Sequence, residues 1–116
     1  MIMKKWALPA LCLLLLAGCN GQKGYKDGVF RGEATGYSKD TPIEVEVSIV
    51  DGNMVAVDII SHDESVEQVP QVQEAFDTLP GAMVKKNTTQ IDGIAGATET
   101  SKGIGNAVEK ALERAK

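Results

Sequence analysis

Two stretches of alternating side chains around an Asp-Gly pair constrain the fold most. Residues 43–50 alternate apolar and acidic or polar side chains, and residues 54–60 return to β-branched ones. A period of two buries one face of a strand. Asp51-Gly52 between two such runs is typical of a tight hairpin turn. The inner face of this predicted hairpin carries Ile43, Val45, Val47 and Ile49 on the first strand and Val55, Val57 and Ile59 on the second.

The flanking segments extend this hairpin into an α+β fold. Residues 25–37 predict a further strand, although its glycines weaken it. Residues 69–79 place apolar side chains at helical spacing, and Pro80-Gly81 should end that helix. Residues 81–88 suggest a second short helix that Asn87 closes, and residues 88–94 a short strand or extended piece. Strands followed by helices indicate a small antiparallel sheet, a three-stranded meander, with helices packed on one face.

The last segment, residues 101–116, predicts an amphipathic closing helix. Its apolar stripe consists of Ile104, Val108, Ala111, Leu112 and Ala115. Gly103 and Gly105 in its first turns weaken a helix. Close approach of the sheet or of a ligand would explain them.

The N-terminus resembles a bacterial lipoprotein signal. Lys4 and Lys5 precede a short apolar run that ends in Leu-Ala-Gly-Cys. We expect residues 1–18 to be a lipoprotein signal peptide, Cys19 to carry lipid such as palmitate, and residues 19–24 to form a tether. The protein would then be extracytoplasmic and held at the inner or outer membrane. The alternative is an ordinary signal peptide or an uncleaved anchor with a chance cysteine.

Residues 19–116 then form one small domain without a disulfide, because Cys12 lies in the removed segment. The chain has 16 acidic and 12 basic residues and no basic stripe, which argues against nucleic acid as a partner.

The stretch Asp-Gly-Ile-Ala-Gly-Ala-Thr-Glu-Thr-Ser, residues 92–101, lies just before the closing helix. A helix N-terminus presents unpaired N–H groups and the positive end of the dipole, and small residues let a phosphate approach. The simpler interpretation is a capped helix, with Thr98, Thr100 or Ser101 as the N-cap. These residues alone leave both open.

A longer stretch, IDGIAGATETSKGIGNAVEKAL, resembles the C-terminal motif of the FMN-binding domain family. That family includes the flavin subunits of sodium-pumping NADH:quinone reductase and of Rnf complexes. Its pattern runs Asp-x-x-Ser/Thr-Gly-Ala-Thr-x-Thr-Ser. The resemblance covers residues 25–116 and includes the segments DGVFRGEATGY, ISHDES and LPGAMVKKNT.

The resemblance implies an FMN cofactor joined to the Thr98 hydroxyl through a phosphoester. It places Gly93, Gly96 and Ala97 at the cofactor site as small neighbours of the acceptor, and Thr100 and Ser101 as residues that cap the helix or touch the phosphate. It also implies that Asp92 orders the loop or is read by an external flavin transferase, and that His62 lies at the edge of the flavin site. One departure is Ala95, where the family has Ser or Thr.

The resulting functional hypothesis is a membrane-anchored flavoprotein that relays electrons to a partner protein or an external acceptor. The alternatives are a self-contained flavin reductase, with a ferric, quinone or fumarate-type acceptor, and a lipoprotein that has lost its flavin.

No catalytic residue or metal site is predicted, because His62, Asp63 and Glu64 are adjacent and their side chains should point to different sides. Lys85 and Lys86 are expected on the helix surface. Four other large side chains are expected in the core: Phe30, Tyr37, Phe76 and Met83.

Overall fold

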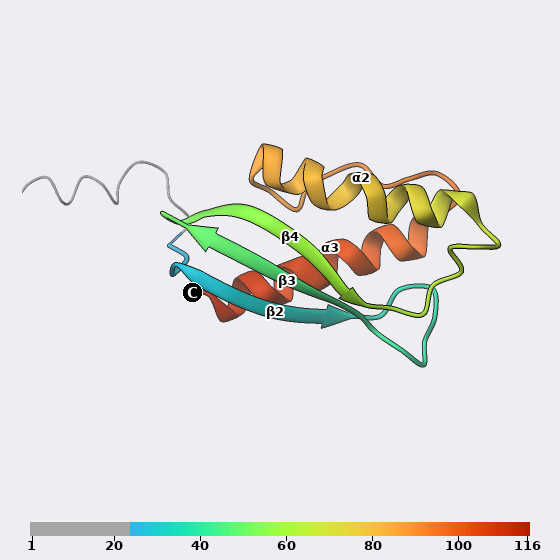
Figure 1. Cartoon of the computed structure of the whole chain (residues 1–116), viewed down its shortest axis with the longest axis horizontal. Helices are drawn as coiled ribbons and strands as arrows, with labels where there is room; N and C mark the ends of the chain where they lie inside the picture. Colours follow the sequence, from blue (N-terminus) through green and yellow to red (C-terminus); the bar gives the residue numbers. More distant parts are fainter. Residues whose placement is uncertain (1–23) are drawn as a thin grey trace, which may run out of the picture.

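The computed structural model describes residues 24–116, which fold as a three-stranded antiparallel sheet with two helices on one face (Figure 1). The strands are β2 (Gly28–Ala34), β3 (Ile43–Val50) and β4 (Asn53–Ser61), in the order β2-β3-β4. The helices are α2 (Pro70–Lys86) and α3 (Thr98–Arg114). The predicted α+β class and the meander are therefore confirmed. The predicted signal peptide, Cys19 and most of the tether lie outside the described residues.

The hairpin forms as its sequence predicts, because Asp51 and Gly52 both adopt positive φ angles, 56° and 80°. Two such residues twist the turn to match the flanking strands. The side chains of β3 that alternate toward the helices are almost completely buried: Ile43, Val45, Val47 and Ile49.

The predicted inner face of β4 is wrong at its start. In the pairing of β3 with β4, Ser48 lies opposite Ala56, but the next residue, Ile49, lies opposite Met54. Val55 is therefore skipped and has no partner on β3. An extra residue of this kind interrupts the alternation, so that the side chains before it face opposite to what the simple period of two predicts from those after it. Met54 is therefore buried and Val55 is 50% exposed, whereas Val57 and Ile59 pack against the core as predicted.

Helix α2 is one continuous helix, and the predicted break at Pro80-Gly81 does not occur. A proline lacks the N–H of a helical hydrogen bond and crowds the preceding turn. Here Ala75 and Leu79 before the proline and Met83 after it are all buried in the same core, and this packing holds both halves in line. Asn87, at φ 54°, ends the helix, and the N–H of Thr88 returns to the Met83 carbonyl.

Helix α3 packs across β2 and β3, and α2 packs against β4 and α3. The predicted apolar stripe of α3 is buried along its whole length. Residues 88–97 are extended and turn-like, and they return from the end of α2 to the start of α3 (Figure 1). Three connecting segments consequently meet at the end of the molecule where α3 begins: residues 35–42, 62–69 and 92–97.

Candidate functional site

The turn before α3 is held by its own backbone and by Ser101. The N–H of Ala97 donates to the Ile94 carbonyl at 2.9 Å, and the N–H of Ile94 donates to Ser101 Oγ at 3.0 Å. Gly96 has a φ angle of 89°, which side chains rarely adopt. The turn therefore has one defined shape, with Ser101 buried beneath it.

The N-cap of α3 is Ala97, so the alternative of a cap by Thr98, Thr100 or Ser101 is wrong. No side chain in the described part of the chain makes a cap hydrogen bond at this end. Thr98 is the first helical residue, three positions earlier than the sequence predicted. The first N–H groups of a helix lack intrahelical partners and form its positive end. This uncapped end suits a phosphate group.

Thr98 is exposed and lies between two hollows that both include it in their lining. We call them the Lys102 hollow and the Tyr37 hollow. The hydroxyl-bearing side chain is thus accessible to another molecule, and either side of it offers room for a ligand.

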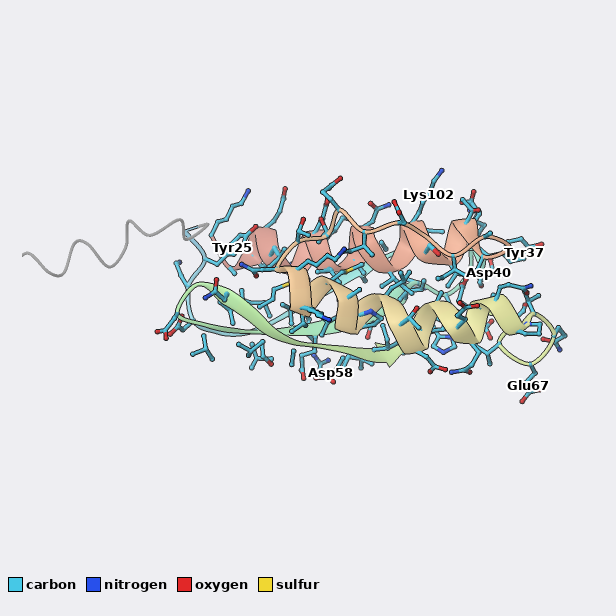
Figure 2. The ribbon with its side chains drawn as sticks, turned by 90° about the horizontal axis from the view of Figure 1, so that it is seen from above. Tyr25, Tyr37, Asp40, Asp58, Glu67 and Lys102 are labelled. Carbon is cyan, nitrogen blue, oxygen red and sulfur yellow. The ribbon has the colours of Figure 1, made fainter. Side chains whose placement is uncertain are left out.

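The Lys102 hollow, of about 470 Å³, lies between α2, the extended segment and α3. Its rim is polar, with Gln90, Lys102, Asn106 and Glu109, and its floor includes Leu79 and Met83. Lys102 is exposed, one helical turn after Thr98, and points outward from α3 (Figure 2). Residues four apart on a helix are neighbours, so its ammonium group can reach a charge on Thr98.

The Tyr37 hollow, of about 510 Å³, lies on the other side of the turn. It is lined by Tyr37, Ser65, Gln68, Val69, Val72, Gly96, Ala97, Thr98, Glu99 and Thr100. Tyr37 is 67% exposed, so its predicted core position is wrong, and it lies where α3 begins (Figure 2). The loop between β2 and β3 leaves the sheet before Tyr37 and turns this ring away from the core. Of the other large side chains expected in the core, Met83 is buried and Phe30 and Phe76 are partly buried.

Glu64, which belongs to the His62-Asp63-Glu64 run for which no site was predicted, is buried behind the Tyr37 hollow. Its carboxyl oxygens accept hydrogen bonds from the backbone N–H groups of Tyr37 and Ser38 and from the Thr100 hydroxyl. Thr100 is thus inside the fold, 1% exposed, and its hydroxyl points to a carboxylate. The only sequence signal for Glu64 was an acidic residue after a strand, which solvated loops also show.

The structure does not bring His62 or Asp92 into either hollow. The His62 ring stacks on Phe76 with centroids 4.1 Å apart, and its Nδ1 accepts the N–H of Glu64. Asp92 is exposed, and Ser101 supplies the side-chain bond that holds the turn. Among residues 24–116, no three His, Cys, Asp or Glu side chains come together as a metal site.

Comparison with known families identifies the cofactor. The model of the FMN-binding domain matches residues 36–113, which contain both hollows and all of the motif around Thr98. The chain belongs to the FMN-binding domain family. FMN is accordingly its cofactor, as the sequence predicted.

The chain is also similar to part of a much longer protein. An uncharacterized protein of Treponema pallidum (strain Nichols) is 32% identical over 89 residues, which cover 77% of this chain. The match covers 23% of the relative, so this chain spans less than a quarter of that protein's length.

The residues at the start of α3 fit FMN. The uncapped N–H groups and Lys102 provide positive potential for a phosphate. The Tyr37 hollow offers an exposed aromatic face together with Val69 and Val72 for an apolar ring system. Cys19 lies outside the described residues, and none of the helices in residues 24–116 is long and apolar enough to cross a bilayer.

Proposed function

We propose that this protein is an extracytoplasmic, lipid-anchored flavoprotein that carries FMN covalently on Thr98 and relays electrons to a partner protein or an external acceptor. The observation that carries the proposal is the exposed Thr98 side chain at the uncapped end of α3, within reach of both hollows. The lipoprotein-like sequence at residues 1–19 supports the location.

Attachment requires an activated flavin donor and an enzyme. Thr98 Oγ1 would form the bond to phosphorus, and the phosphoanhydride bond of a flavin dinucleotide would break. The hydroxyl proton would pass to a base, and the departing nucleotide would take the electron pair. A hydroxyl needs a neighbouring base for such an attack. His62 stacks on Phe76 rather than lining a hollow with Thr98, so it is not placed to act as that base, and we assign the base to a separate transferase.

Each part of the site has a role in holding the cofactor. The N–H groups of the first turn of α3 and the Lys102 ammonium would neutralise the phosphoester, and Gly96 and Ala97 keep its surroundings small. Tyr37, Val69 and Val72 would contact the flavin ring. FMN supplies the redox chemistry, and the protein supplies attachment and environment.

An electron relay fits this domain better than a complete enzyme. Both hollows are open to solvent and share Thr98, so a flavin attached there lies at the surface of the domain and not in a closed substrate pocket. An open site lets a partner protein bring its own cofactor close. The redox partners would therefore be proteins or external acceptors that approach the end of the molecule where α3 begins.

Mass spectrometry tests the attachment directly. Protein recovered from cells that contain the transferase should be heavier by one FMN residue. Thr98→Ala should remove that gain, and Thr98→Ser, which keeps a hydroxyl, should preserve at least part of it. Unmodified wild-type protein from such cells would refute the covalent attachment.

The relay and the self-contained reductase give different kinetics. The loaded protein alone should exchange electrons once per flavin with a chemical reductant. It should turn over steadily only when a donor protein is present together with a partner protein or an external acceptor. Steady turnover with a small-molecule donor and ferric, quinone or fumarate acceptors alone would favour the reductase.

A further inference from the structure

Glu64 joins three separate parts of the chain through one buried carboxyl group. Glu64 Oε1 accepts hydrogen bonds from Tyr37 N at 3.0 Å and from Thr100 Oγ1 at 2.5 Å. Glu64 Oε2 accepts one from Ser38 N at 3.1 Å. The residue is 7% exposed. Buried polar groups are held by their partners, and a lost partner leaves an expensive unpaired group. These bonds therefore fix the relative positions of the segments that they join.

Two of the residues held by Glu64 are walls of the Tyr37 hollow. Tyr37 comes from the loop after β2, and Thr100 is two residues after Thr98 in the first turn of α3. Glu64 itself lies outside the lining. It consequently acts on the hollow through its neighbours and not by touching a ligand.

The position of Glu64 is fixed in turn from the side of α2. Its N–H donates to His62 Nδ1 at 3.0 Å, and the His62 ring stacks on Phe76 of α2. Gly36 leaves the space that the carboxyl group needs, because a Cβ there would lie 2.9 Å from Glu64 Oε1. A continuous set of contacts thus runs from α2 through His62 and Glu64 to the start of α3.

We propose that Glu64 is a positioning residue for the flavin: it sets the separation between the Tyr37 wall and the Thr98 hydroxyl. This inference rests on the proposed attachment of FMN to Thr98. Without the carboxyl contacts, the β2–β3 loop and the first turn of α3 lose their common anchor. The acceptor hydroxyl is then presented in several orientations, and the attached flavin has a less defined environment.

Single-atom variants separate this role from general stability. In Glu64→Gln, the amide has one acceptor oxygen and one NH₂ group, so at least one backbone N–H of Tyr37 or Ser38 faces a donor. Thr100→Val removes the hydroxyl at nearly constant shape, whereas Thr100→Ser keeps it. Asn87→Ala is the matched control, because it removes a side-chain acceptor for a backbone N–H, that of Met54, at the opposite end of α2.

The experiment measures attachment and the attached flavin at a temperature where every variant is folded. Each purified chain is incubated with the transferase and a flavin dinucleotide, and the initial rate is followed by mass. The visible circular dichroism and reduction potential of the loaded protein are then recorded. We expect Glu64→Gln and Thr100→Val each to slow attachment roughly tenfold, about the effect of one buried hydrogen bond, and to alter the flavin dichroism. The double variant should be less harmful than the two single effects combined, because both variants act on the same hydrogen-bond network around the Glu64 side chain.

The outcomes distinguish this inference from the function on which it rests. If wild-type protein takes up no flavin at Thr98, the proposed attachment fails and the role of Glu64 fails with it. If wild-type protein loads normally and Glu64→Gln and Thr100→Val match Asn87→Ala in rate, dichroism and potential, attachment stands and the positioning role is refuted. The positioning role is supported if Thr100→Ser is closer to wild type than Thr100→Val is, both in the rate of flavin attachment and in the flavin dichroism. If Glu64→Gln does not fold, the Thr100 pair decides.

Discussion

Two glycines in the first turns of α3 provide a sharp test of how tightly this helix is packed. A Cβ on Gly103 would lie 2.8 Å from the Gly36 Cα and 3.0 Å from the Thr35 carbonyl oxygen. A Cβ on Gly105 would meet only the end of Met83, at 3.9 Å. The same substitution by alanine therefore meets backbone at one position and an ordinary contact at the other.

The expected energies follow from helix propensity and packing. Alanine is about 1 kcal/mol better than glycine inside a helix, so Gly105→Ala should stabilise the protein by about that amount. Gly103→Ala gains the same propensity but forces atoms into a filled space, which costs roughly 1–3 kcal/mol. Because two of the three nearest neighbours are backbone atoms that cannot rotate away, and the third is the end of the fully buried Ile43 side chain, we expect the upper part of that range. Gly103→Ala should then be destabilising by about 1–2 kcal/mol, a gap of roughly 2–3 kcal/mol between the variants.

Urea unfolding followed by circular dichroism measures this gap directly. The midpoints should move in opposite directions with an unchanged slope, since neither variant alters the surface exposed on unfolding. For a domain of this size, each kcal/mol corresponds to a shift of about 4–8 °C in Tm. Equal shifts for the two variants would show that the contact between α3 and residues 35–36 is loose, and would contradict the close approach described here.

Three further predictions concern other parts of the fold. Met54→Ala should cost about 2–5 kcal/mol in unfolding free energy, whereas Val55→Thr should change it by less than about 0.5 kcal/mol; similar losses would argue against the shift in strand pairing at Val55. Gly96→Ala should destabilise the turn before α3 and lower flavin loading, because the residue has a positive φ; undiminished loading would contradict this. The hydrogen bond and charge of Arg114 lower the pKa of Glu33, so the stabilisation is present above the ordinary carboxyl pKa and is lost as the pH falls through the lowered value. In Arg114→Ala, an NMR titration should show the Glu33 pKa returning upward, and an unchanged value would refute the pairing.

Much of the site could be located from the sequence, although its walls could not. The motif from Asp92 to Ser101 pointed to Thr98 just before the closing helix, and the structure makes it the first residue of that helix, with an exposed side chain. Nothing in the local pattern showed that Tyr37 would leave the core or that Glu64 would enter it. Both follow from contacts across more than 25 residues of chain, which a short sequence window does not contain.

The sequence by itself determined the elements whose signals are local. The period of side chains follows from the backbone. The alternation in residues 43–50 and the apolar stripe of α3 therefore indicate which side of each element is buried, and the Asp-Gly pair indicates where the hairpin turns. Only the tertiary structure decided how these elements meet: that α2 continues through Pro80, that Val55 turns outward, and that a buried carboxyl group ties the β2–β3 loop to the start of α3. These outcomes depend on packing and on hydrogen bonds between distant residues, which outweigh local preference once the core has formed.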